Sequence, residues 1–406
     1  MSKNAQGGAG ESPARDSAGR SIPPVHRTSI LLFCVSTFFY WAALYLYVPI
    51  LPVYAQSLGA SLSMVGIVVA SYALPQLLLR VPMGLWSDAL GRRKPLVAAG
   101  VVMTLVGALG LGLAPTPLFL TVARTATGIG ASVWVLFSVY FVSFYPPENT
   151  GRAMGFINFV QSTALVVASL GGGIIAQALG SRQTFFGATL LGALSLFALL
   201  PASEPRPSIR GTFTWRDFAR VAANPHLLVV SAMGILLQFA QFATVFGFIP
   251  VYGAKIGASN AELGILTMLA TMAGAVSALA APRVAERWGY AFTLLLGSML
   301  MAVSLVAVPF ITSVLVLDAD QFVAGLGRGM LVTTLMTQSI QAVPSHQRAT
   351  AMGIYQATYS VGMLLGPLIS GFVADSQGLA VVFYLSAAIS LMIAVTAYLP
   401  IKSRPS

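Results

Sequence analysis

The sequence predicts an all-α integral membrane protein, with twelve transmembrane helices arranged as two related halves of six. Three observations predict this fold: the composition, the number and length of the apolar runs, and an internal duplication. Hydrophobic residues make up 57% of the 406 residues, and charged residues only 8%. A soluble domain usually carries about 25% charged residues. This chain therefore lacks the charge needed to cover a water-facing surface.

The apolar runs are long enough to cross a bilayer, because about 20 helical residues span roughly 30 Å of hydrocarbon. The expected spans are residues 28–51, 63–83, 95–114, 118–142, 153–176, 184–202, 227–251, 263–281, 291–310, 315–342, 351–374 and 379–400.

The spans divide the chain into two halves with short polar segments around them. We expect six-helix bundles at 28–202 and 227–401, joined by a linker at 203–226 with a short amphipathic helix on the membrane surface. Residues 1–27 are rich in Gly, Ser, Ala and Pro, which predicts a disordered cytoplasmic tail. A second short tail follows at 402–406.

Lysine and arginine indicate the orientation. Most of the 22 lie in the tails and even-numbered connections, whereas the opposite connections hold only Arg182 and Lys255. Positive residues stay cytoplasmic, so both termini are expected in the cytoplasm, with the protein spanning the cell inner (plasma) membrane many times. The net charge of +11 is then a topology signal, and the expected partner is the lipid bilayer rather than nucleic acid. We expect a monomer.

The two halves can be superposed with a shift of 197 to 198 residues. Three pairs of segments match at this shift: MGFINFV from Met154 with MGIYQAT from Met352, ATGIGAS with AGLGRGM, and Asp88 with Glu286. Two six-helix repeats around a midplane site are typical of secondary transporters.

Charge is concentrated in GLWSDALGRRKP, residues 84–95. Its pattern is carried by Gly84, Asp88, Gly91, Arg92 and Arg93. It resembles the loop between helices 2 and 3 of the major facilitator superfamily, and the resemblance extends over residues 28–401. In that family the motif latches the halves together on the cytoplasmic side when the protein faces outward. The second copy, PRVAERWGY, lacks the Arg-Arg pair, so the resemblance implies an asymmetric latch.

Two further motifs resemble the twelve-helix drug:proton antiporters of this superfamily. Arg124 lies in LTVARTATGIGAS, which is similar to the helix 4 motif whose arginine is associated with proton coupling. Helix 11 carries Gly362, Gly366 and Pro367, nearly the full glycine–proline signature that the antiporters show in helix 5. Small residues at this spacing allow close helix packing. Helix 5 of this chain lacks the Gly-Pro pair.

Ionisable residues within a span are candidates for proton coupling. Asp318, Asp320 and Arg328 lie in the span at 315–342, and Gln321 mirrors Arg124. We expect Asp320 to carry the proton. The alternatives are a structural pair between Asp320 and Arg328, an Arg124 bonded only to backbone carbonyls, and an Asp318 in a first turn where the helix dipole favours an anion.

Polar and aromatic residues within the spans outline a candidate substrate site. An apolar pocket with a few polar groups suits amphipathic organic ligands, although core or lipid packing is the alternative for any single aromatic. Helix 1 holds no carboxylate, which argues against a strictly cationic substrate. The candidate residues are Trp41, Tyr45, Trp134, Asn158, Gln161, Gln238, Gln241, Phe242, Gln321, Tyr355, Gln356 and Tyr359.

The sequence therefore predicts a secondary transporter that exports amphipathic organic compounds in exchange for protons by alternating access. No nucleotide-binding G-x-x-x-x-G-K-[ST] loop is present, so a gradient must supply the energy. A dedicated metabolite, siderophore or lipid exporter without proton coupling is the alternative, and a transporter-like sensor is a weaker one. No histidine lies within a span and the only cysteine is Cys34, so we expect no enzyme activity, metal or cofactor.

Overall fold

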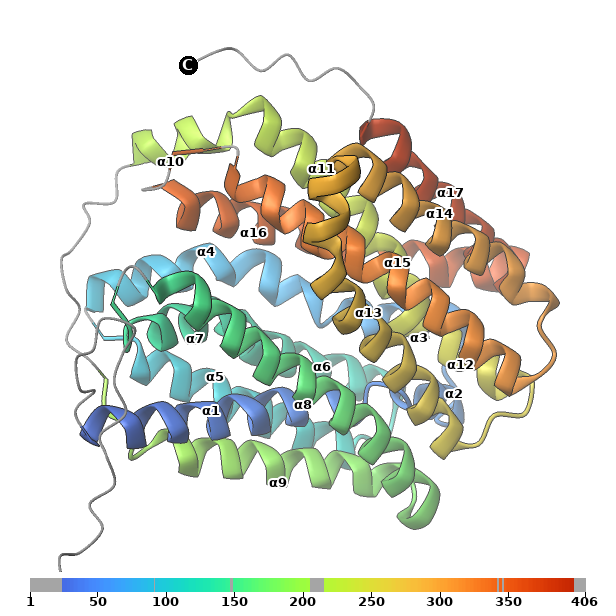
Figure 1. The fold of residues 1–406 in the computed structure, drawn as a ribbon. Coiled ribbons are helices and arrows are strands. Elements are labelled where there is room, and N and C mark those ends of the chain that lie inside the picture. The colour runs from blue at the N-terminus through green and yellow to red at the C-terminus, as the bar shows by residue number, and fades with distance from the viewer. Residues whose placement is uncertain are drawn as a thin grey trace, which may run out of the picture.

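The computed structural model describes residues 24–90, 92–146, 149–204, 215–341, 343–344 and 347–397, and every regular element over these residues is a helix (Figure 1). The first half comprises α1 (Pro24–Tyr45), α2 (Leu51–Ser57), α3 (Leu62–Ala70), α4 (Ala73–Leu90), α5 (Lys94–Leu113), α6 (Pro117–Ser132), α7 (Trp134–Val142), α8 (Thr150–Leu179) and α9 (Ser181–Leu199).

The second half begins with the predicted short linker helix. Its elements are α10 (Trp215–Ala222), α11 (Pro225–Ala243), the π-helix η2 (Thr244–Phe248), α12 (Ile249–Lys255), α13 (Asn260–Trp288), α14 (Tyr290–Ala307), η3 (Val308–Phe310), α15 (Val314–Gln341), α16 (Arg348–Gln377) and α17 (Leu379–Ala397).

The predicted spans correspond to these helices, with local differences at prolines. Within the described residues, eleven helical segments are long and apolar enough to cross a membrane. The span predicted at 315–342 corresponds to α15, which is not among these eleven; its 28 residues include three ionisable side chains. The first span ends at Tyr45 rather than residue 51 because Pro49 disfavours helix in the residue before it.

Two further boundaries differ from the sequence prediction. Helix α1 already begins at Pro24, inside the segment expected to be a tail, because proline is well suited to a first helical turn. The remaining tail residues, 1–23 and 402–406, and residues 205–214 of the linker lie outside the described part of the chain. The π-turn of η2 ends two residues before Pro250, which has no N–H to donate to the preceding turn.

The two halves meet closely at one end of the molecule, where α8 crosses α13 and α3 crosses α16. A Cβ added to Gly173 would lie 2.7 Å from the Cα of Gly264, and one added to Gly371 would lie 2.8 Å from the carbonyl oxygen of Leu62. Gly66 packs equally closely on the backbone of Pro367. We call this end the far side. The charge distribution of the sequence predicts that it lies outside the cytoplasm.

Each crossing is closed by a hydrogen bond from one half to a helix N-terminus of the other. The Asp375 carboxylate of α16 accepts from the backbone N–H groups of Leu62 (2.9 Å) and Ser63 (2.8 Å), where α3 begins. The Gln177 side chain of α8 accepts from the N–H of Asn260 (3.2 Å), where α13 begins. The shift of 198 residues relates these two contacts, so the duplication read from the sequence extends to the packing of the halves.

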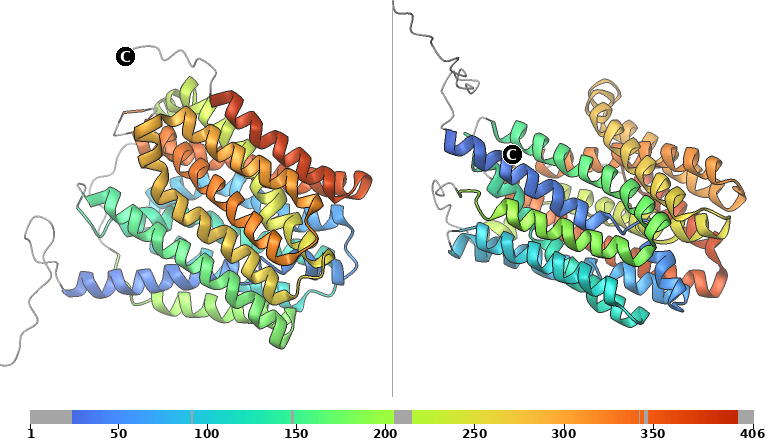
Figure 2. Two further views of the ribbon diagram at one scale, coloured as in Figure 1. Left: turned by 45° about the vertical axis from the view of Figure 1, so that its right-hand side comes forward. Right: turned by 90° about the horizontal axis from the view of Figure 1, so that it is seen from below.

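At the opposite end, which we call the basic side, the halves are further apart. Helices α8 and α13 diverge from their crossing toward this end (Figures 1 and 2). No described atom lies within 4 Å of a Cβ added to Gly84, Gly151, Gly155 or Gly353. The basic side is also where α5 begins, next to the arginine-rich loop. The two halves are therefore in close contact on the far side and further apart on the basic side.

Candidate substrate site between the two halves

An aromatic cluster lies where the halves face each other. We define it by Trp41, Tyr45, Tyr72, Trp134, Phe242 and Phe246. In the first half, the ring centroids of Trp41 and Trp134 lie 5.0 Å apart, and those of Trp41 and Tyr45 lie 5.7 Å apart. The first half meets the second through Tyr45 and Phe246 at 5.7 Å and through Tyr72 and Phe242, which stack at 6.4 Å. The cluster therefore joins both halves.

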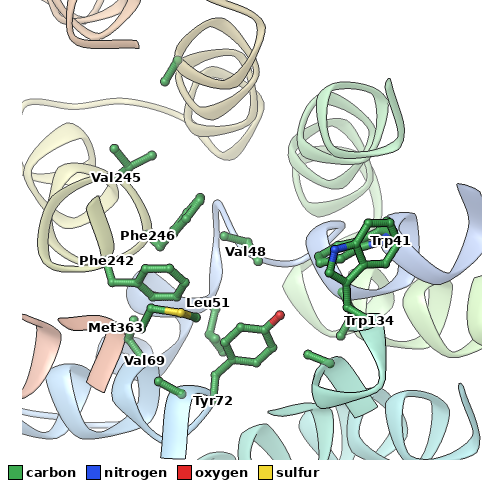
Figure 3. Packing of buried hydrophobic residues seen from close by; sticks show 14 of the residues in the cluster. Trp41, Val48, Leu51, Val69, Tyr72, Trp134, Phe242, Val245, Phe246 and Met363 are labelled. Atoms are coloured by element: carbon green, nitrogen blue, oxygen red, sulfur yellow. The ribbon is translucent and has the colours of Figure 1, made fainter. Parts of the chain in front are cut away.

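Figure 3 shows how these rings are arranged. Phe242, Phe246 and Met363 of the second half lie on one side, and the Trp41–Trp134 pair of the first half lies on the other. The ring of Tyr72 lies between them, with its hydroxyl directed away from the helix backbone. Local breaks position several of these side chains: Tyr72 lies in the turn between α3 and α4, and Phe246 lies in the π-turn.

Several buried polar atoms in the cluster, on α11 and on α16 have no hydrogen-bond partner within the described residues. They include the indole Nε1 of Trp41 and the amide oxygens of Gln238, Gln241 and Gln356. Most buried polar atoms in proteins are hydrogen-bonded. Apolar walls with a few available polar groups are typical of sites for organic ligands, so four of the predicted site residues share the property expected of such a site.

Arg124 of α6 is buried against the cluster. Its Nη1 donates to the Tyr47 hydroxyl at 2.7 Å and to Thr127 Oγ1 at 3.4 Å, and its guanidinium lies 4.2 Å from the centroid of the Tyr72 ring. Its Nε has no partner within the described chain. The hydrogen-bond partners of Arg124 are side-chain hydroxyls rather than the backbone carbonyls expected for a structural cation, and its role in proton coupling stays a prediction.

Arg80 of α4 is a second buried arginine at this boundary, and sequence analysis did not assign it to the site. Its Nη1 donates across the boundary to the carbonyl of Gln356 at 2.8 Å and to Ser360 Oγ at 3.2 Å. The guanidinium also lies 5.2 Å from the Tyr359 ring centroid. The sequence feature that indicates this role is the spacing of Tyr72, Gln76 and Arg80, which places three polar side chains on one face of a helix.

The ionisable residues of α15 lie apart from one another. Arg328 is buried and donates to the carbonyl of Ala270 at 2.5 Å. The Asp320 carboxylate, half-buried, accepts from the Gln321 amide at 3.0 Å, and its backbone carbonyl accepts from Ser304 of α14 at 2.9 Å. Asp320 and Arg328 thus have separate partners, and the alternative of a structural pair between them is wrong.

Asp318 is more buried than Asp320, with an exposed fraction of 9%. Its Oδ1 has no hydrogen-bond partner within the described chain. Asp318 lies in the second turn of α15. A carboxylate in this position is available to a proton.

The predicted gating loop is described in part. Gly91 and the side chain of Asp88, on which the expected latch depends, lie outside the described residues. The backbone N–H of Arg93 donates to Glu204 Oε1 at 2.6 Å, and Arg92 is exposed. Gly84 has open space around it.

The other predicted substrate-site residues lie on α8, α15 and α16. Tyr355 packs on Gly234 of α11, whereas Tyr359 is half-buried beside Arg80. Gln321 is buried next to Asp320, and Asn158 and Gln161 are half-buried on α8.

The predicted packing residues Gly362 and Gly366 contact the backbone of α11 closely, while Pro367 contacts Gly66 of α3. No group of three metal-ligating side chains is present among the described residues.

The fold and this duplicated packing agree with the comparisons to known proteins. The sequence profile described as Major Facilitator Superfamily matches residues 33–317 and 232–406. The chain belongs to the Major Facilitator Superfamily. It is therefore a multi-pass membrane transporter rather than an enzyme.

Similar proteins come from several bacteria. The inner membrane transport protein YajR of Escherichia coli is 25% identical over 376 residues, which cover 87% of this chain and 79% of YajR. Multidrug resistance protein 1 of Bacillus subtilis is 23% identical over 362 residues, 86% of this chain and 90% of that protein. The structure is similar to a bacterial homolog of the human lysosomal transporter Spinster, captured inward-facing and unoccupied. The TM-score is 0.77 at 16% identity, over 93% of this chain and 97% of that one.

Proposed function

We propose that this superfamily member exports amphipathic organic compounds across the inner membrane by alternating access, in exchange for protons. The observation that carries the proposal is the aromatic cluster with its unpartnered polar atoms, since it is built from both halves. A site shared by two halves changes its exposure when the halves rock against each other. The similarity to a multidrug resistance protein supports the same class of cargo.

The far-side contacts support alternating access. These contacts are non-covalent. They consist of a few hydrogen bonds from backbone N–H groups to side chains and of close helix crossings at glycines. Such contacts can separate and re-form as rigid bodies move. Access from the basic side, followed by opening of the far side, would carry a compound outward if the basic side is cytoplasmic.

Proton coupling is supported by the two carboxylates within α15, of which Asp318 is buried and Asp320 half-buried. Asp320 was the carboxylate expected from sequence to carry the proton, and Asp318 is the more buried of the two, with an oxygen that has no partner in the described chain. We include both in the proposed proton path, with Asp318 as the first candidate. We also include Arg124 and Arg328 in the proposed proton path, because they are buried positive charges whose electric field extends to neighbouring groups.

The proposal is tested with purified protein in liposomes that contain a trapped pH-sensitive dye. A pH gradient is imposed and a panel of lipophilic cations, neutral antibiotics and organic anions is added in turn. We expect at least one class to cause proton movement that protein-free liposomes do not show. Substrate flux without proton movement would replace antiport by an uncoupled carrier, and silence across the panel would contradict export of amphipathic compounds.

A further inference from the structure

We propose that the substrate is an amphipathic organic anion, with a carboxylate, phosphate or sulfonate headgroup on an apolar body. This inference rests on the proposed transport function and names the charge class of its cargo. Three observations support it. Three arginines are buried, several side-chain N–H groups have no hydrogen-bond partner, and no carboxylate among the described residues bonds to these arginines. Each of these observations is independent of the similarity to known transporters.

The three arginines come from three different helices and are all buried. Arg80 of α4, Arg124 of α6 and Arg328 of α15 are 7%, 4% and 6% exposed, respectively. Their hydrogen-bond partners are backbone carbonyls, hydroxyls and one glutamine amide. Within the described residues, no carboxylate bonds to any of the three. Buried charges are costly unless they are paired, so a bound anion would supply the missing counter-charge.

The carboxylates of α15 lie too far along the helix to fill this role. Asp320 precedes Arg328 by eight positions and Asp318 by ten, which is about 12 to 15 Å along a helix axis. The Asp320 carboxylate is also bonded to Gln321. The arginines and the carboxylates are therefore separate groups: Arg80 and Arg124 lie at the boundary of the halves, Arg328 contacts α13, and the carboxylates lie nearer the far side.

Unpartnered donors give the second line of argument. Three N–H groups on side chains more than nine-tenths buried have no partner in the described chain: Trp41 Nε1, Arg80 Nε and Arg124 Nε. All three groups can only donate. A carboxylate, phosphate or sulfonate headgroup offers only acceptors when ionised, and bonds to a guanidinium are the strong, charge-assisted kind. The nearby Gln238, Gln241 and Gln356 can offer either end of the amide.

Short links connect the arginines to the aromatic cluster. Arg124 lies over Tyr72, whose backbone carbonyl accepts from Gln76, and the Gln76 oxygen in turn accepts from Arg80. The headgroup would thus be held by Arg80 and Arg124, while the apolar body packs on Trp41, Phe242 and the other rings.

A cationic amphiphile fits this arrangement poorly. It would bring a like charge to the guanidinium groups of Arg80 and Arg124 in a region of low dielectric constant, where repulsion is stronger than in water. Cation–π contacts with the rings favour a cation, but Tyr72, Tyr47 and Tyr359 already face Arg124 or Arg80. The positive charge of the arginines therefore favours an anionic substrate over a cationic one.

The test uses three probes with one apolar body and three charges: pyrenebutyrate, pyrenebutanol and pyrenebutyl-trimethylammonium. Binding to the purified full-length protein in neutral detergent is followed by energy transfer from tryptophan to pyrene. We expect pyrenebutyrate to bind at least tenfold more tightly than the cation. Arg124→Gln and Arg80→Gln should each weaken pyrenebutyrate at least fivefold and leave pyrenebutanol unchanged. Arg124→Lys, which keeps the charge, should retain the preference.

The matched control is Arg283→Gln, which removes one positive charge from an exposed position of α13 and should change no affinity. Equal or tighter binding of the cation would overturn the inference while leaving transport of amphipathic compounds intact. Equal weakening of all three probes in Arg124→Gln would also overturn it, because that result shows a structural role. No binding of any probe to the unmodified protein would overturn the proposed function together with the inference.

Discussion

The carboxylate of Asp375 on α16 accepts the backbone N–H of Ser63 on α3 at 2.8 Å, so a residue of the second half caps a helix of the first. The same carboxylate accepts from the neighbouring Leu62. A negative charge at a helix N-terminus is favoured by the helix dipole and satisfies N–H groups that the helix itself leaves free. This contact must break whenever the far side opens.

Replacing this charge should loosen the far side. In Asp375→Asn the side chain keeps its size but loses its charge, so we expect the amides of Leu62 and Ser63 to exchange hydrogen several-fold faster, since capping bonds of this kind hold helix ends. Hydrogen exchange with peptide-level mass spectrometry measures this. The control is Ser376→Ala, which alters the next residue without touching α3. Unchanged exchange in Asp375→Asn would show that the capping bond does not contribute to closure.

The close crossing of α8 and α13 depends on Gly264. A side chain at this position would enter the space taken by Gly173, since an added Cβ already lies 2.9 Å from the Gly173 Cα. We expect Gly264→Leu to lower transport at least tenfold because the far side cannot close. Gly155→Ala on α8, where the added Cβ meets no described atom within 4 Å, should transport within twofold of the original protein. Substrate flux into liposomes distinguishes the two, and equal activity would contradict the crossing.

Glu204 stabilises the start of α5. Its two carboxylate oxygens accept from the backbone N–H groups of Arg93 (2.6 Å) and Lys94 (3.2 Å). Glu204→Gln should cost about 1 kcal/mol, the usual value of an N-terminal cap, and lower the thermal midpoint in detergent. Glu286→Gln removes a carboxylate from an exposed position of α13 and should not shift it. Equal midpoints for both variants would rule out a stabilising role for Glu204.

Asp318 is expected to be needed for coupling but not for substrate binding. Asp318→Asn keeps the side-chain size and removes the proton site, so proton movement should be lost while the probe affinities stay within twofold. The dye-loaded liposomes and the pyrene probes measure the two effects separately. Asp320→Asn is the paired comparison. If only Asp320→Asn abolishes proton movement, the carrier is Asp320, as the sequence alone suggested.

The latch expected from the family motif remains a prediction. Asp88→Asn should reduce transport while the protein still inserts and folds, because the motif is expected to hold the basic side shut when the far side is open. Transport and the amount of folded protein in the membrane are measured together. Normal transport by a well-expressed variant would count against the latch.

The membrane-spanning helices could be predicted because the length of an apolar run is a property of the sequence itself. Trp41, Trp134 and Phe242 were predicted as site residues because aromatic and polar side chains are conspicuous within apolar runs. Arg80 and Tyr72 were not, since their roles depend on which helices cross. The capping by Asp375 joins residues more than 300 positions apart in the chain, and no local pattern indicates such a contact.

The central claim is that the far side must open for transport, and one cross-linking measurement tests it most directly. Cysteines replace Gln177 and Asn260, whose contact joins the two halves, in a chain with Cys34→Ser. Oxidation should link the pair and stop substrate flux in liposomes, and reduction should restore it. The single-cysteine variants should be insensitive to the oxidant. Undiminished flux through the fully cross-linked protein would contradict alternating access at this boundary.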